Sequence, residues 1–276
     1  MIADMRSDFR LMGVINVTPD SFSDGGSFLE ADAAIAQGRR LAGEGADLLD
    51  VGGESTRPGA EPVDAEDELA RVLPVVAALV ADEKATLSID TSKRAVAEAA
   101  VAAGATYVND VTAFRAEPAL AGLVAERGLD CCLMHMLGEP RTMQDDPRYG
   151  DVVADVKSFL EQRLAFAVAE GVPEERVMLD PGIGFGKTIA HNLELLRRLE
   201  EIVAIGCPVV IGTSRKSFLG KLTGHGVDDR LPGTIATNVL AYERGATVFR
   251  VHDVAPVAQA LAVAAATIPR SDPAPN

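Results

Sequence analysis

The sequence predicts an α/β protein built as a single (β/α)8 barrel, also called a TIM barrel. The chain has 276 residues, and one such barrel takes about 250 residues as a single domain. A short apolar run followed by a stretch with helical periodicity recurs eight times, and strands alternating with helices indicate α/β architecture. Eight such units favour a closed barrel over an open doubly wound sheet.

The apolar runs are expected to form the strands of the barrel. They are rich in Val, Ile and Leu and barely alternate with polar residues, which is typical of parallel strands buried on both faces. The runs span residues 11–17, 47–52, 86–90, 106–110, 130–136, 176–181, 208–213 and 247–251.

The segments between the runs are expected to form the helices. Residues 31–45, 64–81 and 151–170 place apolar side chains at helical spacing on one face. Several segments are followed by glycine, which readily adopts the left-handed conformation that ends a helix. These glycines are Gly45, Gly104, Gly128, Gly171, Gly206 and Gly245.

One domain is expected over residues 1–270, followed by a disordered Pro-rich tail at 271–276. No apolar stretch approaches the roughly 18 residues of a membrane span, and the N-terminus lacks the apolar run of a signal peptide. Cys131, Cys132 and Cys207 show no disulfide or zinc pattern. We therefore expect a reduced, cytoplasmic protein with no membrane partner.

The net charge also restricts the choice of ligands. A formal charge of −15 opposes binding to nucleic-acid phosphates and to anionic membranes. A free phosphorylated metabolite would be repelled as well, unless the chain gathers its cations locally. Small molecules are therefore the expected partners, and a phosphorylated one requires a local basic cluster.

Unusual polar residues cluster where the expected strands end. In a barrel these ends converge on one mouth, where active sites form. A single Asp at a strand end is about as often a plain capping group as a functional residue. Polar residues at all eight strand ends, however, favour an active site. The residues are Asn16, Asp50, Asp90, Asn109, Asp110, His135, Asp180, Ser214, Arg215, Lys216, Arg250 and His252.

The chemistry of this set suits a flat heterocycle with an amidine-like edge, such as a pterin. Asp90, Asn109 and Asp180 offer carboxylate and amide groups, and a carboxylate matches a planar N–H/NH₂ edge through both of its oxygens. Lys216 can donate to a ring oxygen or nitrogen on the opposite side.

A second group of residues suits phosphate. Arg57, Arg215, Lys216, Arg250 and His252 follow strands 2, 7 and 8, and residues 214–220 can start a short helix of the kind that binds phosphate in barrels. No Cys/His cluster has zinc spacing. A magnesium ion held by Asn16 and phosphate oxygens is more plausible, because magnesium usually keeps few protein ligands.

Three loops need separate interpretation. The Gly-rich loops at 18–26 and 52–59 have the composition of lids that order over a substrate, although each alone would pass for an ordinary surface turn. The segment 180–188 superficially resembles a nucleotide-binding P-loop. Its first glycine position is occupied by Pro181, so we discount that interpretation.

Together these motifs resemble the dihydropteroate synthase family, and the similarity spans nearly the whole chain. The first two signatures are GVINVTPDSFSDGG at 13–26 and DVGGESTRPGA at 50–60. They are followed in family order by SIDTSK at 88–93, ND at 109–110, MHM at 134–136, LDPGIGFGKTIAHN at 179–192, TSRKSFLG at 213–220 and RVHDV at 250–254.

The resemblance implies a reaction and a role for each site residue. The enzymes of this family condense 6-hydroxymethyl-7,8-dihydropterin pyrophosphate with p-aminobenzoate in folate biosynthesis and release pyrophosphate. The residues implied to bind the pterin are Asp90, Asn109, Asp180, Phe185 and Lys216. Those implied to bind pyrophosphate are Asn16, through Mg²⁺, Arg250 and His252. Those implied to line the p-aminobenzoate site are Phe22, Thr56, Arg57, Pro58, Ser214 and Ser217.

We expect catalysis to depend on Asp90, Asp180, Lys216, Arg250 and His252. No general base is evident for the attacking amine, whereas the site supplies positive charge for a departing pyrophosphate. This bias favours a dissociative displacement. The resemblance further implies a homodimer that is a target of sulfonamides.

Two alternatives stay open at this point. A pterin-binding methyltransferase barrel would share the Asp and Asn pterin contacts, but it would not need the pyrophosphate cations Arg250 and His252. A non-catalytic pterin-binding or scaffold protein would be expected to lose a lid or a cation, and none is missing. An assay for pyrophosphate release that depends on p-aminobenzoate would separate the three.

Overall fold

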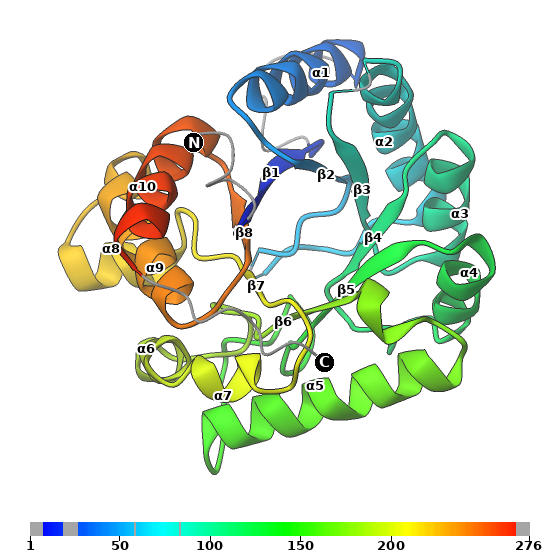
Figure 1. Ribbon diagram of the computed structural model, residues 1–276. Helices are drawn as coiled ribbons and strands as arrows, with labels where there is room; N and C mark the ends of the chain where they lie inside the picture. Colours follow the sequence, from blue (N-terminus) through cyan, green and yellow to red (C-terminus); the bar gives the residue numbers. More distant parts are fainter. Residues whose placement is uncertain (1–7, 19–26, 58, 83, 269–276) are drawn as a thin grey trace.

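The computed structural model describes residues 8–18, 27–57, 59–82 and 84–268, and it confirms the (β/α)8 barrel (Figure 1). Within these residues, eight parallel strands follow one another in the order β6-β5-β4-β3-β2-β1-β8-β7. A bridge between Leu179 and Val209 brings β6 next to β7 and nearly closes the ring. The strands are β1 (Arg10–Asn16), β2 (Leu48–Gly52), β3 (Thr86–Asp90), β4 (Tyr107–Asp110), β5 (Asp130–Met134), β6 (Val177–Asp180), β7 (Val210–Ile211) and β8 (Val248–Val251).

Helices surround the strands on the outside (Figure 1). Two of the expected helices begin where an aspartate accepts hydrogen bonds from the first turn, Asp64 before α2 and Asp151 before α5. The helices are α1 (Ser27–Gly43), α2 (Ala65–Val80), α3 (Arg94–Ala102), α4 (Ala119–Arg127), α5 (Val152–Ala169), α6 (Ile189–Arg197), α7 (Glu200–Val203), α8 (Ser217–Thr223), α9 (Leu231–Glu243) and α10 (Val254–Thr267), with short 3₁₀ turns η3 (Glu174–Arg176) and η4 (Val227–Asp229).

A single type of turn leads from helix to strand at several places. After α1, the Gly45 N–H donates to the Ala42 carbonyl and the Ala46 N–H donates to the Leu41 carbonyl, both at 3.0 Å. Gly45 has φ of 99°, a conformation that glycine adopts without steric cost. The same turn recurs at Gly104 and Gly245, and all six glycines expected to end helices have positive φ.

Several strands are shorter than their apolar runs. The largest difference lies in residues 208–213, where only Val210–Ile211 pairs as a strand. Pro208 has no N–H for a ladder, although its carbonyl accepts from the Leu179 N–H at 2.9 Å. The run 130–136 ends as a strand at Met134, and 11–17 is displaced by one residue to Arg10–Asn16.

The hydrophobic core has two parts. The larger part lies between the strands and the helices and contains residues such as Ile15, Val76 and Leu160. A smaller layer fills the interior of the barrel with Met12, Leu48, Tyr107, Cys132, Met178, Val210 and Val248. Because the barrel interior is packed rather than hollow, any ligand must bind above this layer.

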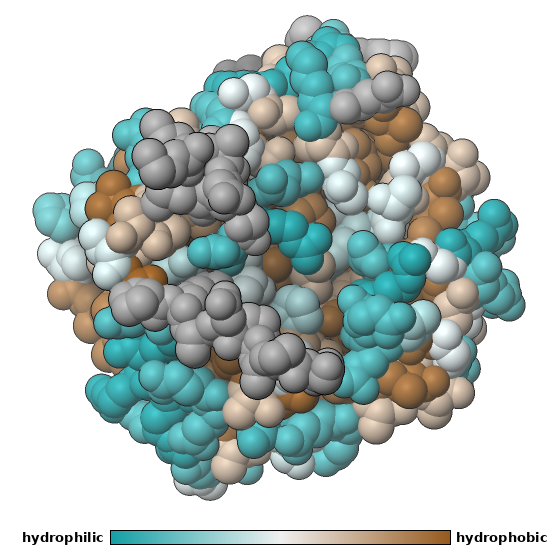
Figure 2. Space-filling model, in the orientation of Figure 1, coloured by the Kyte–Doolittle hydropathy of each residue, from teal (hydrophilic) through white to brown (hydrophobic). Residues whose placement is uncertain are grey.

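The outer surface is mostly polar on the face shown in Figure 2, where hydrophobic residues are scattered between hydrophilic ones. No helix in the described residues is long and apolar enough to cross a membrane. The expected tail at 271–276 lies outside the described residues.

Candidate active site

The side chains that point into the barrel change from apolar to polar within two residues along several strands. Side chains two residues apart on a strand point to the same face. Leu48, Tyr107, Met178 and Val248 of the inner apolar layer are thus followed on the same face by Asp50, Asn109, Asp180 and Arg250. The strands therefore place a polar floor directly above the apolar layer, at the C-terminal end of the barrel.

Asp50 holds this floor together. Its Oδ1 accepts from Ser88 Oγ at 2.6 Å, and its Oδ2 accepts from Asn109 Nδ2 at 2.9 Å and from Arg250 Nε at 2.6 Å. The side chain is fully buried, and a buried carboxylate needs such partners. The sequence places Asp50 at a strand end but predicts no role for it. Its inward position two residues after Leu48 was the signal that could have identified it.

Arg250 joins two of the floor carboxylates. Its Nη2 donates to Asp90 Oδ2 at 2.7 Å while Nε donates to Asp50. Burial raises the pKa of Asp90, and the adjacent positive charge of Arg250 opposes this increase. Burial alone would lower the pKa of Arg250, but the carboxylates of Asp50 and Asp90 raise it above its usual value. The guanidinium is thus held as a permanent cation against the floor.

Asp180 ends β6 with one oxygen already engaged. Its Oδ1 accepts from the Gly182 N–H at 2.6 Å. Gly182 has φ of +66°, and a Cβ there would lie 1.8 Å from the His135 carbonyl oxygen. The turn therefore requires glycine and fixes the direction of the carboxylate. Burial raises the pKa of Asp180, and the charge of Lys216 opposes this increase.

Lys216 approaches from the loop after β7. Its Nζ donates to the Ile183 carbonyl and lies 4.4 Å from the centre of the Phe185 ring. Burial lowers the pKa of Lys216 to about 8, opposed by Asp180. α8 begins at Ser217, directly after Lys216, which confirms the expected short helix. The structure thus brings Asp180, Phe185 and Lys216 together beside the floor.

The structure supports the rejection of a P-loop at 180–188. The Lys187 side chain is buried, and its Nζ lies 2.8 Å from His135 Nδ1 and donates to the Phe185 carbonyl at 3.0 Å. Burial lowers the pKa of Lys187 well below its usual value. A lysine enclosed in this way stabilises its own loop and is not presented to a phosphate.

His252 and Ser214 form the rim near β8. His252 Nδ1 lies 3.0 Å from Ser214 Oγ, which also accepts from the His252 backbone N–H at 3.1 Å. Burial, with Arg250 and Arg215 contributing, lowers the pKa of His252 to about 4. The ring is therefore neutral near pH 7 and acts as a hydrogen-bonding group rather than as a cation. Arg215 is paired with Asp253 at 2.6 Å.

The remaining expected residues lie around the mouth. Asn16 ends β1 half-buried. Thr56 is half-buried and Arg57 exposed in the loop after β2, and Arg57 lies near enough to contribute to the lowered pKa of His252. Phe22 and Pro58 lie outside the described residues, as does most of the first lid. Among the described residues, no group of three or more His, Cys, Asp or Glu side chains could hold a metal ion.

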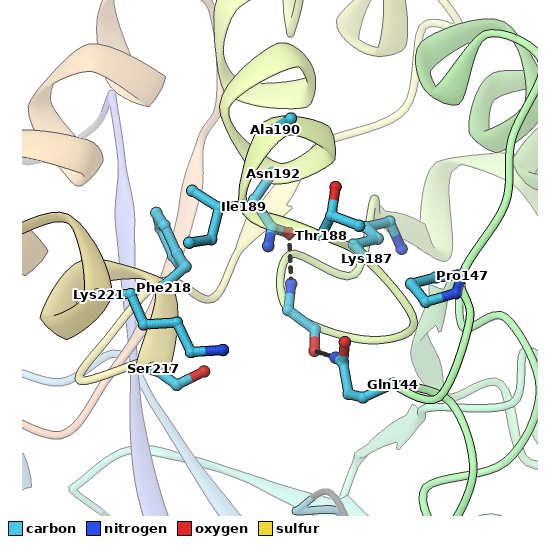
Figure 3. A pocket seen from close by; sticks show the side chains of 11 residues that line it. Gln144, Pro147, Lys187, Thr188, Ile189, Ala190, Asn192, Ser217, Phe218 and Lys221 are labelled. Atoms are coloured by element: carbon cyan, nitrogen blue, oxygen red, sulfur yellow. Dashed lines mark hydrogen bonds between the residues drawn. The ribbon is translucent and has the colours of Figure 1, made fainter.

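A cavity of about 630 Å³ lies beside the 182–186 loop (Figure 3). The backbone of Gly184 is fixed from two sides, because its N–H donates to Asn192 Oδ1 and its carbonyl accepts from Gln144 Nε2, both at 2.7 Å. Ser217 and Lys221 of α8 line the other side of this cavity. Ser217 thus faces this cavity.

The barrel and its polar floor match one class of proteins. A family model described as pterin binding enzyme matches residues 12–252, which includes all the floor residues named above. The class defined by the fold and the site is therefore that of the pterin-binding enzymes.

Individual relatives narrow this class. The dihydropteroate synthase of Escherichia coli (strain K12) is 44% identical over 258 residues, covering 94% of this chain and 91% of that protein. A Xanthomonas albilineans dihydropteroate synthase with 4-aminobenzoic acid superposes with a TM-score of 0.89 at 49% identity, covering 96% of this chain and 95% of the other. A structure of that enzyme in complex with 7,8-dihydropteroate gives 0.86 at 46% identity, with 96% of each chain covered. The chain belongs to the dihydropteroate synthase family.

Proposed function

We propose that this chain condenses 6-hydroxymethyl-7,8-dihydropterin pyrophosphate with p-aminobenzoate to form 7,8-dihydropteroate and pyrophosphate in folate biosynthesis. The observation that carries the proposal is the buried polar floor of Asp50, Asn109, Asp180 and Arg250 above an apolar barrel interior. A pyrophosphate-release assay tests it. Release that depends on both substrates is expected, and release without p-aminobenzoate, or none at all, would contradict it.

Pterin recognition follows from the fixed direction of Asp180. With Oδ1 held by Gly182, Oδ2 is free to accept from an N–H or NH₂ of the ring. Lys216 would donate to the opposite edge, Phe185 would pack against the ring, and Asn109 and Asp90 would complete the floor. A protonated Lys216 serves this role, so its lowered pKa makes binding sensitive to alkaline pH.

Arg250 would serve both the ring and the leaving group. In the free protein its guanidinium is bound to Asp50 and Asp90, so it contributes to the same floor that receives the pterin. A bound pterin that engages Asp90 would free Nη2 to donate to pyrophosphate. The family resemblance implies a pyrophosphate contact for Arg250, to which we add a role on the ring side of the site.

Magnesium fits the site only as an ion carried mainly by the substrate. Asn16 offers one amide oxygen at the end of β1, and the described residues provide no carboxylate cluster for a metal. We therefore assign Asn16 as the protein ligand, with the remaining positions left to phosphate oxygens and water. When bound, magnesium would neutralise charge on the pyrophosphate.

The charges of the site favour breaking the C–O bond before the amine attacks. The electron pair of that bond leaves with pyrophosphate, next to Arg250 and the neutral donor His252. The electron-rich pterin would spread the positive charge of its methylene carbon, and this charge would in turn favour the ionised forms of the nearby Asp90 and Asp180. The nitrogen of p-aminobenzoate then forms the C–N bond and loses a proton.

The p-aminobenzoate site would form after the pterin is bound. Thr56 and Arg57 belong to the loop after β2, and Ser214 and Ser217 to the loop after β7. These two loops would close over the pterin and exclude water from the cation. Phe22 and Pro58 are proposed to join them.

We also propose a cytoplasmic homodimer. The thiols of Cys131, Cys132 and Cys207 are free and buried, as expected in a reducing compartment. Exposed apolar side chains on α8, η4, α9 and α10 could form the contact between subunits, namely Leu222, Val227, Leu240 and Val263. Sedimentation velocity tests this, and a monomer at micromolar concentration would contradict it.

A further inference from the structure

A partly buried ionic cluster of Lys93, Glu54 and Glu68 lies at the base of the loop after β2. Lys93 Nζ donates to Glu54 Oε2 and, at 2.5 Å, to Glu68 Oε2. Glu68 on α2 has no exposed surface, and its second oxygen has no hydrogen-bond partner in the described residues. Burial alone would lower the pKa of Lys93, but its bonds to Glu54 and Glu68 raise it. Lys93 is therefore held as a cation between two carboxylates.

The same cluster closes the loop upon itself. Glu54 Oε1 accepts from the Val63 N–H at 3.3 Å, so this carboxylate joins the two ends of the loop. The Gly53 carbonyl accepts from Arg71 Nη1 at 2.8 Å, and a Cβ at Gly53 would lie 2.8 Å from Val72. The base of the loop is thus fixed against α2, whereas Thr56 and Arg57 extend beyond it.

Lys93 links this loop to the polar floor. It precedes the first residue of α3 and follows Asp90 by three positions. Between them the Thr91 N–H donates to the Asn109 carbonyl at 3.1 Å, and Thr91 Oγ1 accepts from the Lys93 N–H at 3.2 Å. The position of the loop is therefore set relative to Asp90 and Asn109, the residues expected to bind the pterin.

Stability alone does not explain this arrangement. A buried ion pair is often no more stabilising than apolar side chains of similar size, and an oxygen without a partner adds a cost. A charged pair does, however, fix the relative position of its partners, because each needs the other. Here one partner is on the loop and the other is anchored next to the floor.

We propose that Lys93 and Glu54 are positioning residues, which hold the loop after β2 so that Thr56 and Arg57 meet p-aminobenzoate above a bound pterin. Neither residue belongs to the groups proposed to contact the pterin, pyrophosphate or p-aminobenzoate. The proposal rests on the proposed function for its substrate, but the geometry of the loop can be tested without it.

The kinetic test uses Lys93→Met and Glu54→Gln, with Glu117→Gln as the matched control. Glu117 accepts from the Arg94 N–H at 2.9 Å at the start of the same helix but does not contact the loop. We expect both variants to raise KM for p-aminobenzoate by about tenfold or more, while pterin affinity without p-aminobenzoate changes by less than about twofold. Lys93→Arg should restore most of the loss. Equal losses for both substrates, or an unchanged KM for p-aminobenzoate, would overturn the proposal.

Hydrogen exchange separates this proposal from the proposed function. In unliganded protein, the backbone amides of residues 55–57 and 59–61 should exchange faster in the Lys93→Met and Glu54→Gln variants than in the wild type and in Glu117→Gln. Unchanged exchange would overturn the positioning role whatever the activity of the enzyme. If Lys93→Met does not fold, the Glu54→Gln variant alone tests the proposal. That variant keeps the ion pair between Lys93 and buried Glu68, so it should remain folded.

Discussion

Replacing Asp180 with asparagine should weaken pterin binding while leaving the fold intact. The Asp180 side chain is buried, and its Oδ1 is fixed by the Gly182 N–H at 2.6 Å. In the variant, the amide oxygen takes over this bond, since the backbone N–H needs an acceptor. The amide NH₂ then occupies the position from which Oδ2 would accept from the pterin. In the variant, the amide NH₂ and the pterin N–H, which are both donors, would therefore face each other. In the wild type the charged Oδ2 of Asp180 would accept from that N–H.

The magnitude follows from that one bond. A hydrogen bond to a charged group contributes about 1.5–3 kcal/mol, so the dissociation constant should rise by roughly 10- to 150-fold. The turn cannot relax to reduce this loss, because Gly182 lies against the His135 carbonyl.

Calorimetric titration with a pterin that carries no pyrophosphate measures this loss directly. Asp130→Asn is the matched control. Asp130 begins the neighbouring strand β5, at the end of the barrel away from Asp180, and it is paired with Arg176 at 3.2 Å. It should leave pterin affinity unchanged. An affinity for Asp180→Asn within about twofold of the wild type would refute the assignment of Asp180 to the ring.

The other predictions concern the floor, the loop and the order of events. Arg250→Ala leaves buried Asp50 without its cation, so the free energy of unfolding, measured by chemical denaturation, should fall by about 3 kcal/mol. The same variant should lose more affinity for the pyrophosphate ester than for the bare pterin. Equal loss for both ligands would contradict this second expectation. Pterin affinity should decline as pH rises through about 8, because Lys216 then loses its positive charge and becomes a weaker hydrogen-bond donor. Lys216→Met should abolish this decline; a decline that persists in the variant would assign it to another group. Gly182→Ala should cost roughly 3 kcal/mol of stability, because its Cβ would overlap the His135 carbonyl; near-wild-type stability would show that the turn can rearrange. Finally, p-aminobenzoate should bind weakly to the free enzyme, and tight binding would count against the proposed order. Deuterium at the methylene should slow the chemical step, and a secondary isotope effect near unity would count against the cationic transition state.

Most of the fold could be predicted from local patterns. The spans 64–81 and 151–170, expected from apolar spacing, match α2 and α5, which the structure begins after the capping residues Asp64 and Asp151. The strand at 208–213 could not be delimited in this way. Its length depends on hydrogen bonds to β6 and β8, which are far away in the sequence, and Pro208 limits the ladder.

The site could be predicted only in part. Their positions at strand ends predicted that Asp90, Asn109, Asp180 and Arg250 lie together at the mouth of the barrel. In the structure, Asn109 and Arg250 both bind Asp50, and Arg250 also binds Asp90. The pairing of Arg250 with Asp50 joins residues 200 positions apart, so no local pattern could reveal it. The neutral state of His252 likewise depends on burial and on neighbouring charges, which spacing along the chain does not show.

The join between β6 and β7 would give a bound pterin a mechanical role. Leu179 and Val209 form the only bridge between these strands in the described residues, whereas β1 and β2 pair at five positions. Asp180 ends β6 and Lys216 follows β7, so a ring held by both side chains would span the join as a removable crosslink. A circular permutant opened at Gly206, in the turn before β7, would cut the chain beside this join. Its barrel should then close firmly only while a pterin is bound.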